Sequence, residues 1–162
     1  MSFLDLDEFL VELAGRAELV YSPLADVKEY PEGVDVVLVE GAVANEENLE
    51  MIFKVRKRTR ILISFGDCAV TGNVTSLRNP LGGPHEVLKP AYVERPDINP
   101  RIPDEKGIVP KLLERVQPVH ALVPVDFYLP GCPPPAARIR SVLEDLLNGK
   151  QPALDVGQRR FG

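Results

Sequence analysis

Val34-Asp35-Val36-Val37-Leu38-Val39 is a nearly continuous apolar run that is rich in β-branched residues. Such a run is typical of a strand that is buried on both faces, as in a parallel sheet. A second run of the same kind is Arg60-Ile61-Leu62-Ile63-Ser64-Phe65. Between them, Asn45 is placed to cap a helix that begins with acidic and ends with basic residues, and whose expected core stripe is Leu49, Ile52, Phe53 and Val55. A strand, a helix and a strand within about 30 residues predict a right-handed crossover unit.

The segments on either side of this unit extend the same pattern. Apolar spacing predicts helices over 3–15 and 133–148, a short strand over 19–21, and one more strand within 119–129. The chain is therefore expected to be one α/β domain over residues 1–162, a doubly wound parallel sheet of the flavodoxin type. Such a domain begins with a central strand, whereas this chain opens with a helix. We expect either that the sheet starts at Leu19 or that a first strand lies upstream of Met1.

The second half of the chain is rich in proline and has little regular apolar periodicity. Thirteen of the sixteen prolines fall between Pro80 and Pro135, where little periodicity survives apart from residues 109–116. The region nevertheless keeps apolar side chains that a plain linker would lack: Leu81, Val87, Leu88, Tyr92, Ile98 and Ile102. We expect an ordered, irregular excursion over about 80–118 that faces a partner, the alternative being an ordinary long loop.

Composition excludes several classes of protein. Nineteen basic and twenty-four acidic residues give a net charge of −5, so there is no basic excess for binding a nucleic-acid backbone. No apolar run approaches the roughly 18 residues of a membrane span, and no signal peptide opens the chain. There is no P-loop and no Gly-x-Gly-x-x-Gly motif, which argues against nucleotide or NAD binding by this chain. We expect a cytoplasmic protein.

The two cysteines occupy equivalent places in the expected fold. Cys68 and Cys132 each follow a predicted strand, and glycine precedes each of them, in Gly66-Asp67-Cys68 and Gly131-Cys132. Ligands of open α/β sheets bind beyond the carboxyl ends of the strands, and glycine lets the main chain approach a bulky group. Thiolates surrounded by backbone N–H groups suit an iron–sulfur cluster. Buried thiols without function are the alternative, and a disulfide is the least expected outcome.

Two segments carry a resemblance to a known family. Residues 63–73, Ile-Ser-Phe-Gly-Asp-Cys-Ala-Val-Thr-Gly-Asn, followed by Leu77-Arg78-Asn79, resemble the third-cysteine segment of [NiFe]-hydrogenase small subunits. Residues 129–134, Leu-Pro-Gly-Cys-Pro-Pro, resemble the fourth-cysteine segment. Residues 2–5 and 39–43 match as well, so the resemblance covers nearly the whole chain. The superfamily includes the 20-kDa subunit of respiratory NADH:quinone oxidoreductase, and the chain is most similar to small subunits of bidirectional NAD-linked hydrogenases of the cyanobacterial type.

The resemblance implies an electron-transfer subunit that does not itself activate hydrogen. It would hold a [4Fe–4S] cluster through Cys68 and Cys132, with Gly66 and Gly131 beside it, proximal to the NiFe site of a large subunit. The further partners implied are iron–sulfur and flavin/NAD diaphorase subunits. The isolated chain would then be part of an oxidoreductase without being catalytic alone.

One part of the family pattern does not appear in this sequence. The first two ligands, a Cys-x-x-Cys pair, belong just before the residues that match Met1 to Leu4. We therefore expect the missing strand and two further cysteine ligands in one segment upstream of Met1. Two alternatives stay open: the corresponding subunit of a quinone-reducing complex, and a docking module without a cluster.

Four other polar residues invite a functional interpretation. Glu40 ends a strand beside Gly41 and is either a proton-handling or water-ordering group near the cluster or a carboxylate that binds the N–H groups of the next turn. Asp67 either tunes the cluster potential through its charge or is a simple turn residue. His85 and His120 lack partners at zinc-ligand spacing, so we expect surface or core roles for both.

Overall fold

A central sheet of three parallel strands organises the protein. The computed structural model describes residues 3–22, 26–94 and 100–161. The strands lie in the order β1-β3-β5. Their bounds are β1 Val34–Glu40, β3 Thr59–Phe65 and β5 Phe127–Leu129. The α/β parallel architecture expected from the two apolar runs is thereby confirmed.

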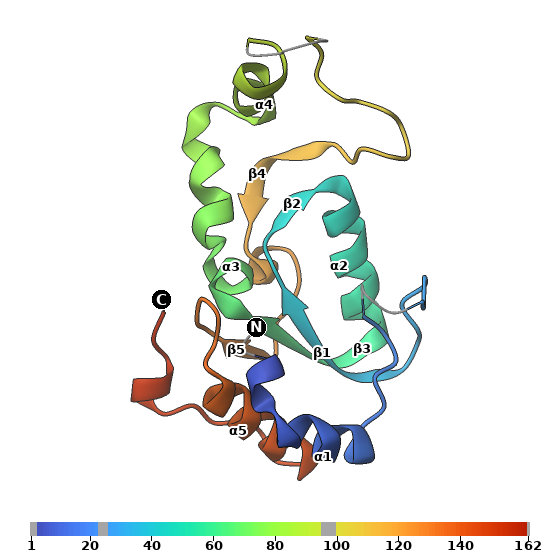
Figure 1. Ribbon diagram of the computed structural model, residues 1–162, viewed down its shortest axis with the longest axis vertical. Helices are drawn as coiled ribbons and strands as arrows, with labels where there is room; N and C mark the ends of the chain where they lie inside the picture. Colours follow the sequence, from blue (N-terminus) through green and yellow to red (C-terminus); the bar gives the residue numbers. More distant parts are fainter. Residues whose placement is uncertain (1–2, 23–25, 95–99, 162) are drawn as a thin grey trace.

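Helices cover both faces of this sheet, as a doubly wound fold requires (Figure 1). On one face, α1 (Glu8–Arg16) and α5 (Ala136–Leu147) pack on a core that includes Ile63 and Leu129. On the other face, α2 (Glu46–Arg58) and α3 (Gly66–Thr71) contribute to a second core around Leu62. The alternation of Leu62 and Ile63 between the two cores follows from the two-residue period of a strand.

The crossover unit forms as predicted. The Asn45 side chain accepts a hydrogen bond from the Asn48 backbone N–H at 2.8 Å, which caps α2. Basic residues occupy the last turn of α2, where the helix dipole favours positive charge. Within the predicted core stripe, Ile52 and Val55 are buried, but Phe53 is 50% exposed and its assignment to the core was wrong.

Strand β1 differs from the expectation of burial on both faces. Within the described residues it pairs only with β3, so it is an edge strand, and its apolar side chains are half-buried. The strand predicted over 19–21 does not form: this segment is part of the connection after α1, and Leu19 is 82% exposed. The helix predicted over 3–15 is interrupted at Asp7, whose φ is 47°, between η1 (Leu4–Leu6) and α1. Met1 and Ser2 lie outside the described residues.

The proline-rich region contains more regular structure than its sequence suggests. Its start overlaps the end of η2 (Asn73–Leu81), and α4 (Pro84–Tyr92) follows. Proline at the first position of α4 lacks only an N–H that has no partner inside a helix anyway. Strand β4 (Leu112–Gln117) pairs antiparallel with β2 (Val43–Asn45) in a second, two-stranded sheet. Residues 95–99 of the expected excursion, including Ile98, lie outside the described structure. Short 3-10 turns, η3 (Val119–Ala121) and η4 (Val156–Gln158), complete the fold.

The Leu77-Arg78-Asn79 motif attaches η2 to this small sheet. The Asn79 side chain accepts from the Val116 N–H at 2.7 Å and donates to the Val116 carbonyl at 2.9 Å. Arg78 donates to the carbonyls of Ala44 and Leu113, one on each strand. The side chains of η2 therefore satisfy backbone groups of β2 and β4.

No helix among the described residues is both long enough and apolar enough to cross a membrane.

Asp126 fixes the start of β5 against β3. Its carboxylate accepts from the Leu62 N–H at 2.7 Å and from Arg56 at 2.5 Å. Partial burial raises the pKa of the Asp126 carboxyl, but the Leu62 N–H and the Arg56 guanidinium outweigh it and hold that pKa below its ordinary value of 3.8.

The depressed pKa predicts a specific pH dependence. A carboxyl whose pKa is lower in the folded than in the unfolded chain stabilises the fold above the unfolded value and loses this contribution as the pH falls through the folded value. Asp126→Asn should therefore lower the free energy of unfolding near pH 7 and flatten its decline below pH 4. Urea unfolding at both pH values measures this, and Asp35→Asn, which removes an exposed ion pair with Arg60, is the control. Parallel pH profiles for the wild type and Asp126→Asn would contradict it.

Candidate functional site

The carboxyl ends of the three strands lie level with one another. In the sheet register Glu40 pairs with Phe65, and Phe65 pairs with Leu129. The residues that follow these positions therefore leave the sheet at one edge, which is where ligands of open α/β sheets bind. This register places Glu40 and the Gly66 and Gly131 loops at the same edge.

The loops after β3 and β5 are in direct contact. The Asp67 N–H donates to the Gly131 carbonyl at 2.9 Å, and the Gly131 N–H donates to Oδ1 of Asp67 at 2.6 Å. Asp67 is only 5% exposed, so these bonds are shielded from water. The structure thus brings together three of the predicted site residues: Gly66, Asp67 and Gly131.

Both predicted glycines are required by the geometry. Gly131 has a φ of 139°, and a Cβ at this position would lie 2.5 Å from the Cα of Pro134, closer than any real contact. Gly66 has a φ of 81°, and its Cβ would lie 3.5 Å from the Gly131 carbonyl oxygen. Positive φ and close backbone packing are conditions that only glycine meets without strain. The buried Pro134, which the sequence analysis did not single out, forms the wall against Gly131.

The two cysteines are free thiols that differ in exposure. Cys68 lies in α3 and is partly buried, whereas Cys132 is exposed on the loop before α5. A third ligand does not accompany them: within the described ranges, no group of three or more His, Cys, Asp or Glu side chains is placed to hold a metal ion. The donor type and the glycine-lined backbone fit an iron–sulfur cluster, and the described residues contain two cysteines where a four-cysteine cluster takes four.

The remaining candidates take no part in the hydrogen bonds between Asp67 and Gly131. Glu40 is exposed at the end of β1 and lines a hollow of about 140 Å³ with side chains of α2. His85 is exposed on α4, and the His120 ring makes an edge contact with Tyr128 at 5.9 Å between centroids. Both histidines are exposed.

Arg138 is the residue that the sequence analysis missed. It stands in the first turn of α5 and donates to the carbonyl oxygens of Pro130 and Arg160. Its position was a usable signal, because the first turn of a helix disfavours positive charge unless other groups compensate.

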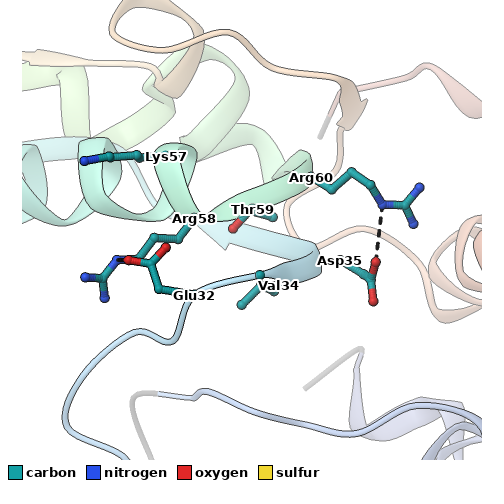
Figure 2. Close-up of a pocket in the computed structure, with 8 residues that line it drawn as sticks. Glu32, Val34, Asp35, Lys57, Arg58, Thr59 and Arg60 are labelled. Carbon is teal, nitrogen blue, oxygen red and sulfur yellow. Dashed lines mark hydrogen bonds and ion pairs between the residues drawn. The ribbon is translucent and has the colours of Figure 1, made fainter.

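A larger hollow, of about 360 Å³, lies at the opposite end of the sheet (Figure 2). Its walls come from the start of β1 and from the junction of α2 and β3. Two of the cations that line it are paired with carboxylates of the same hollow: Arg58 with Glu32 at 2.8 Å, and Arg60 with Asp35 at 3.3 Å. Because it adjoins the amino ends of the strands, this hollow is a poorer candidate than the cysteine edge.

Comparison with known proteins places the chain in a family. A family model described as NADH ubiquinone oxidoreductase, 20 Kd subunit, matches residues 1–146. The chain belongs to this family. Both cysteine loops lie inside the matched range.

Individual relatives of this family are hydrogenase subunits. The chain is 39% identical over 156 residues to the delta subunit of the NAD-reducing hydrogenase HoxS of Cupriavidus necator, with 93% of this chain and 73% of that protein aligned. It is also 39% identical over 156 residues to one of the vhu subunits of the F420-non-reducing hydrogenase of Methanocaldococcus jannaschii. That alignment covers 95% of this chain but 53% of the relative, so the chain spans about half the length of this protein.

A solved structure extends the likeness to three dimensions. The chain superimposes with a TM-score of 0.93 on a chain of an NAD+-reducing [NiFe]-hydrogenase in the H2-reduced state. The two are 38% identical, and the match covers 100% of this chain and 90% of the other.

The Gly131 geometry predicts the effect of adding a methyl group. Gly131→Ala should lower the free energy of unfolding by about 1–3 kcal/mol, because its Cβ must displace the backbone of Pro134. Gly15→Ala is the control, since a Cβ there meets nothing within 4 Å and Gly15 lies in α1. This control should be neutral or stabilising by up to about 1 kcal/mol. Equal stability of the two variants in urea unfolding would refute the packing argument.

Proposed function

We propose that the chain is the electron-transfer subunit of a bidirectional, NAD-linked [NiFe] hydrogenase. In this proposal it holds the [4Fe–4S] cluster proximal to the NiFe site of a large subunit and does not itself activate hydrogen. The observation that carries it is the direct contact of two glycine-lined loops, each bearing one free cysteine, at the carboxyl edge of a parallel sheet.

The chemistry of the loops supports a cluster in preference to a hydrolytic metal. Thiolates are soft ligands that suit iron–sulfur clusters, and among the described residues the site lacks the His and carboxylate set that zinc or magnesium would take. When bound, the cluster would accept and release single electrons. The chain's own contribution is to supply the Cys68 and Cys132 ligands and the backbone around them. The other two ligands are proposed to come from a segment outside this sequence.

Two carboxylates near the cysteine edge have proposed accessory roles. Asp67 is buried next to Cys68, where its charge would influence a reduction potential. Glu40 ends the neighbouring strand and is exposed, as a group that exchanges protons with water must be. Electrons would pass on to iron–sulfur and flavin/NAD diaphorase subunits in the cytoplasm.

Exposed apolar residues on η2 support the partner-facing assignment. Val74, Leu77 and Leu81 are 63%, 68% and 58% exposed, and η2 follows α3, which carries Cys68. Apolar side chains so close to a candidate electron-transfer site fit contact with another subunit. The proposed docking surface therefore starts at residue 73, before the 80–118 region expected from the prolines.

Charge placed on this surface should weaken assembly. Leu77→Lys is expected to reduce co-purification of the chain with a hydrogenase large subunit, because a buried unpaired ammonium is costly. Leu19→Lys is the matched control, as Leu19 is 82% exposed and follows α1, which packs on the opposite face of the sheet from α3. Pull-down of the large subunit measures the effect. Undiminished recovery with Leu77→Lys would remove η2 from the docking surface.

Serine substitutions test the cluster itself. Cys68→Ser and Cys132→Ser should each lower iron per protein and the low-temperature electron paramagnetic resonance signal of the reduced cluster, because a hydroxyl is a hard, mostly protonated ligand. In the assembled enzyme each should also block electron delivery to NAD more than hydrogen–deuterium exchange at the large subunit.

Two outcomes of these measurements would contradict the proposal, one in the serine variants and one in the wild type. If either serine variant keeps the full iron content and the wild-type signal, that cysteine is not a ligand. The second outcome concerns the wild-type, full-length subunit after anaerobic reconstitution. If it binds neither iron nor acid-labile sulfide, the chain is a docking module without a cluster.

A further inference from the structure

We propose that Asp67 and Arg138 are positioning residues that together grip the peptide group between Pro130 and Gly131. By doing so they fix the loop of Cys132 relative to that of Cys68. The proposed function enters this inference only as the purpose of the arrangement. The hydrogen bonds of Asp67 and Arg138 to this peptide group, which we call the grip, are present whether or not a cluster binds.

The peptide group is held at both ends by opposite charges. Its N–H, on Gly131, donates to Oδ1 of Asp67 at 2.6 Å. Its carbonyl, on Pro130, accepts from the Arg138 guanidinium. The carboxylate thus faces the positive end of the peptide dipole and the guanidinium faces the negative end. Charge-assisted hydrogen bonds of this kind are roughly twice as strong as neutral ones.

A glycine at this position needs such support. Gly131 has no side chain to restrict its backbone, and its φ of 139° lies in a region that L side chains rarely adopt. Packing against Pro134 excludes any larger residue, so rigidity must come from outside the loop. Asp67 provides it from the β3 loop and Arg138 from α5.

One side chain therefore connects both candidate ligands. Asp67 immediately precedes Cys68, and its carboxylate binds the residue immediately before Cys132. Its own N–H binds the Gly131 carbonyl at 2.9 Å, which completes a two-bond bridge between the loops. Movement of either loop relative to the other must break at least one of these bonds.

Arg138 has no simpler explanation in the structure. As a cation in the first turn of α5 it is unfavourably placed with respect to the helix dipole. Its neighbour Arg140 is exposed, pairs with Glu144 at 2.7 Å and lies 4.9 Å from the centroid of the Phe9 ring, so its charge has partners outside the cysteine loop. Arg138 instead turns to backbone carbonyls, Pro130 in the cysteine loop and Arg160 near the end of the described chain.

The test compares conservative and disruptive substitutions in the full chain without metal. Asp67→Ala and Arg138→Met remove the grip, whereas Asp67→Asn keeps an acceptor oxygen and Arg138→Lys keeps a cationic donor. Arg140→Met is the control for loss of a positive charge on α5. The readouts are hydrogen exchange of the Gly131 amide and the alkylation rates of Cys68 and Cys132, followed by mass spectrometry.

We expect the two disruptive variants to raise Gly131 amide exchange about tenfold or more, the effect of losing one hydrogen bond. They should also speed the alkylation of Cys132. Asp67→Asn, which keeps the acceptor oxygen but not its charge, should raise exchange less than Asp67→Ala does, and Arg140→Met should leave it unchanged. A residue that only stabilises the fold would change the free energy of unfolding without a specific increase in Gly131 amide exchange or in Cys132 alkylation. Wild-type exchange in Arg138→Met and Asp67→Ala would overturn the proposal. If Asp67→Ala does not fold, the comparison of Arg138→Met with Arg138→Lys decides whether the proposal holds, because Arg138 is only half-buried.

Iron reconstitution separates this inference from the proposed function. If the wild type binds a cluster, both disruptive variants should bind less, since groups that orient ligands are typically worth about 10–100-fold in affinity. Full cluster occupancy in both would show that the grip does not position the ligands. If the wild type binds no cluster, the proposed function fails, while the exchange and alkylation results still decide whether the grip exists.

Discussion

The pair of hydrogen bonds between Asp67 and Gly131 is the interaction on which the candidate site depends. The β-sheet brings the ends of β3 and β5 to the same level, but it does not hold the loops beyond them. These two bonds do so, in a setting where Asp67 is almost wholly buried. A buried carboxylate without such partners would cost more than the fold gains from its presence. The polar contact and the close approach of Gly66 to Gly131 therefore require each other.

The crossover unit could be inferred from sequence because its causes are local. The two apolar runs, the Asn45 cap and the charge gradient along α2 act within about 30 residues, the span of a crossover unit. The same reasoning placed Gly66, Cys68, Gly131 and Cys132 at one sheet edge, since loops that follow parallel strands must gather there.

The errors have physical causes of a different kind. The segment 19–21 has the composition of a strand, but a strand needs a neighbour, and none pairs with it in the described structure. Phe53 fits the apolar stripe of α2, yet the face it occupies is left uncovered among the described residues. Helix α4 contains Pro84 and Pro90, and Pro110 and Pro118 flank strand β4, so prolines obscured both elements in the sequence. Arg138 was missed because its partner Pro130 is set by the tertiary fold, which composition does not encode.

The two cysteines are attached to segments that pack in different hydrophobic cores. Cys68 lies in α3, whose Ala69 belongs to the core shared with α2. Cys132 precedes α5, whose Ile139 and Val142 belong to the core shared with α1. The two thiols thus belong to segments on opposite faces of the sheet, and the hydrogen bonds between Asp67 and Gly131 join these segments directly. A group bound by both thiols would therefore link the layers on the two faces. Its binding free energy would couple their unfolding, so that the loaded chain would unfold more cooperatively than the empty chain.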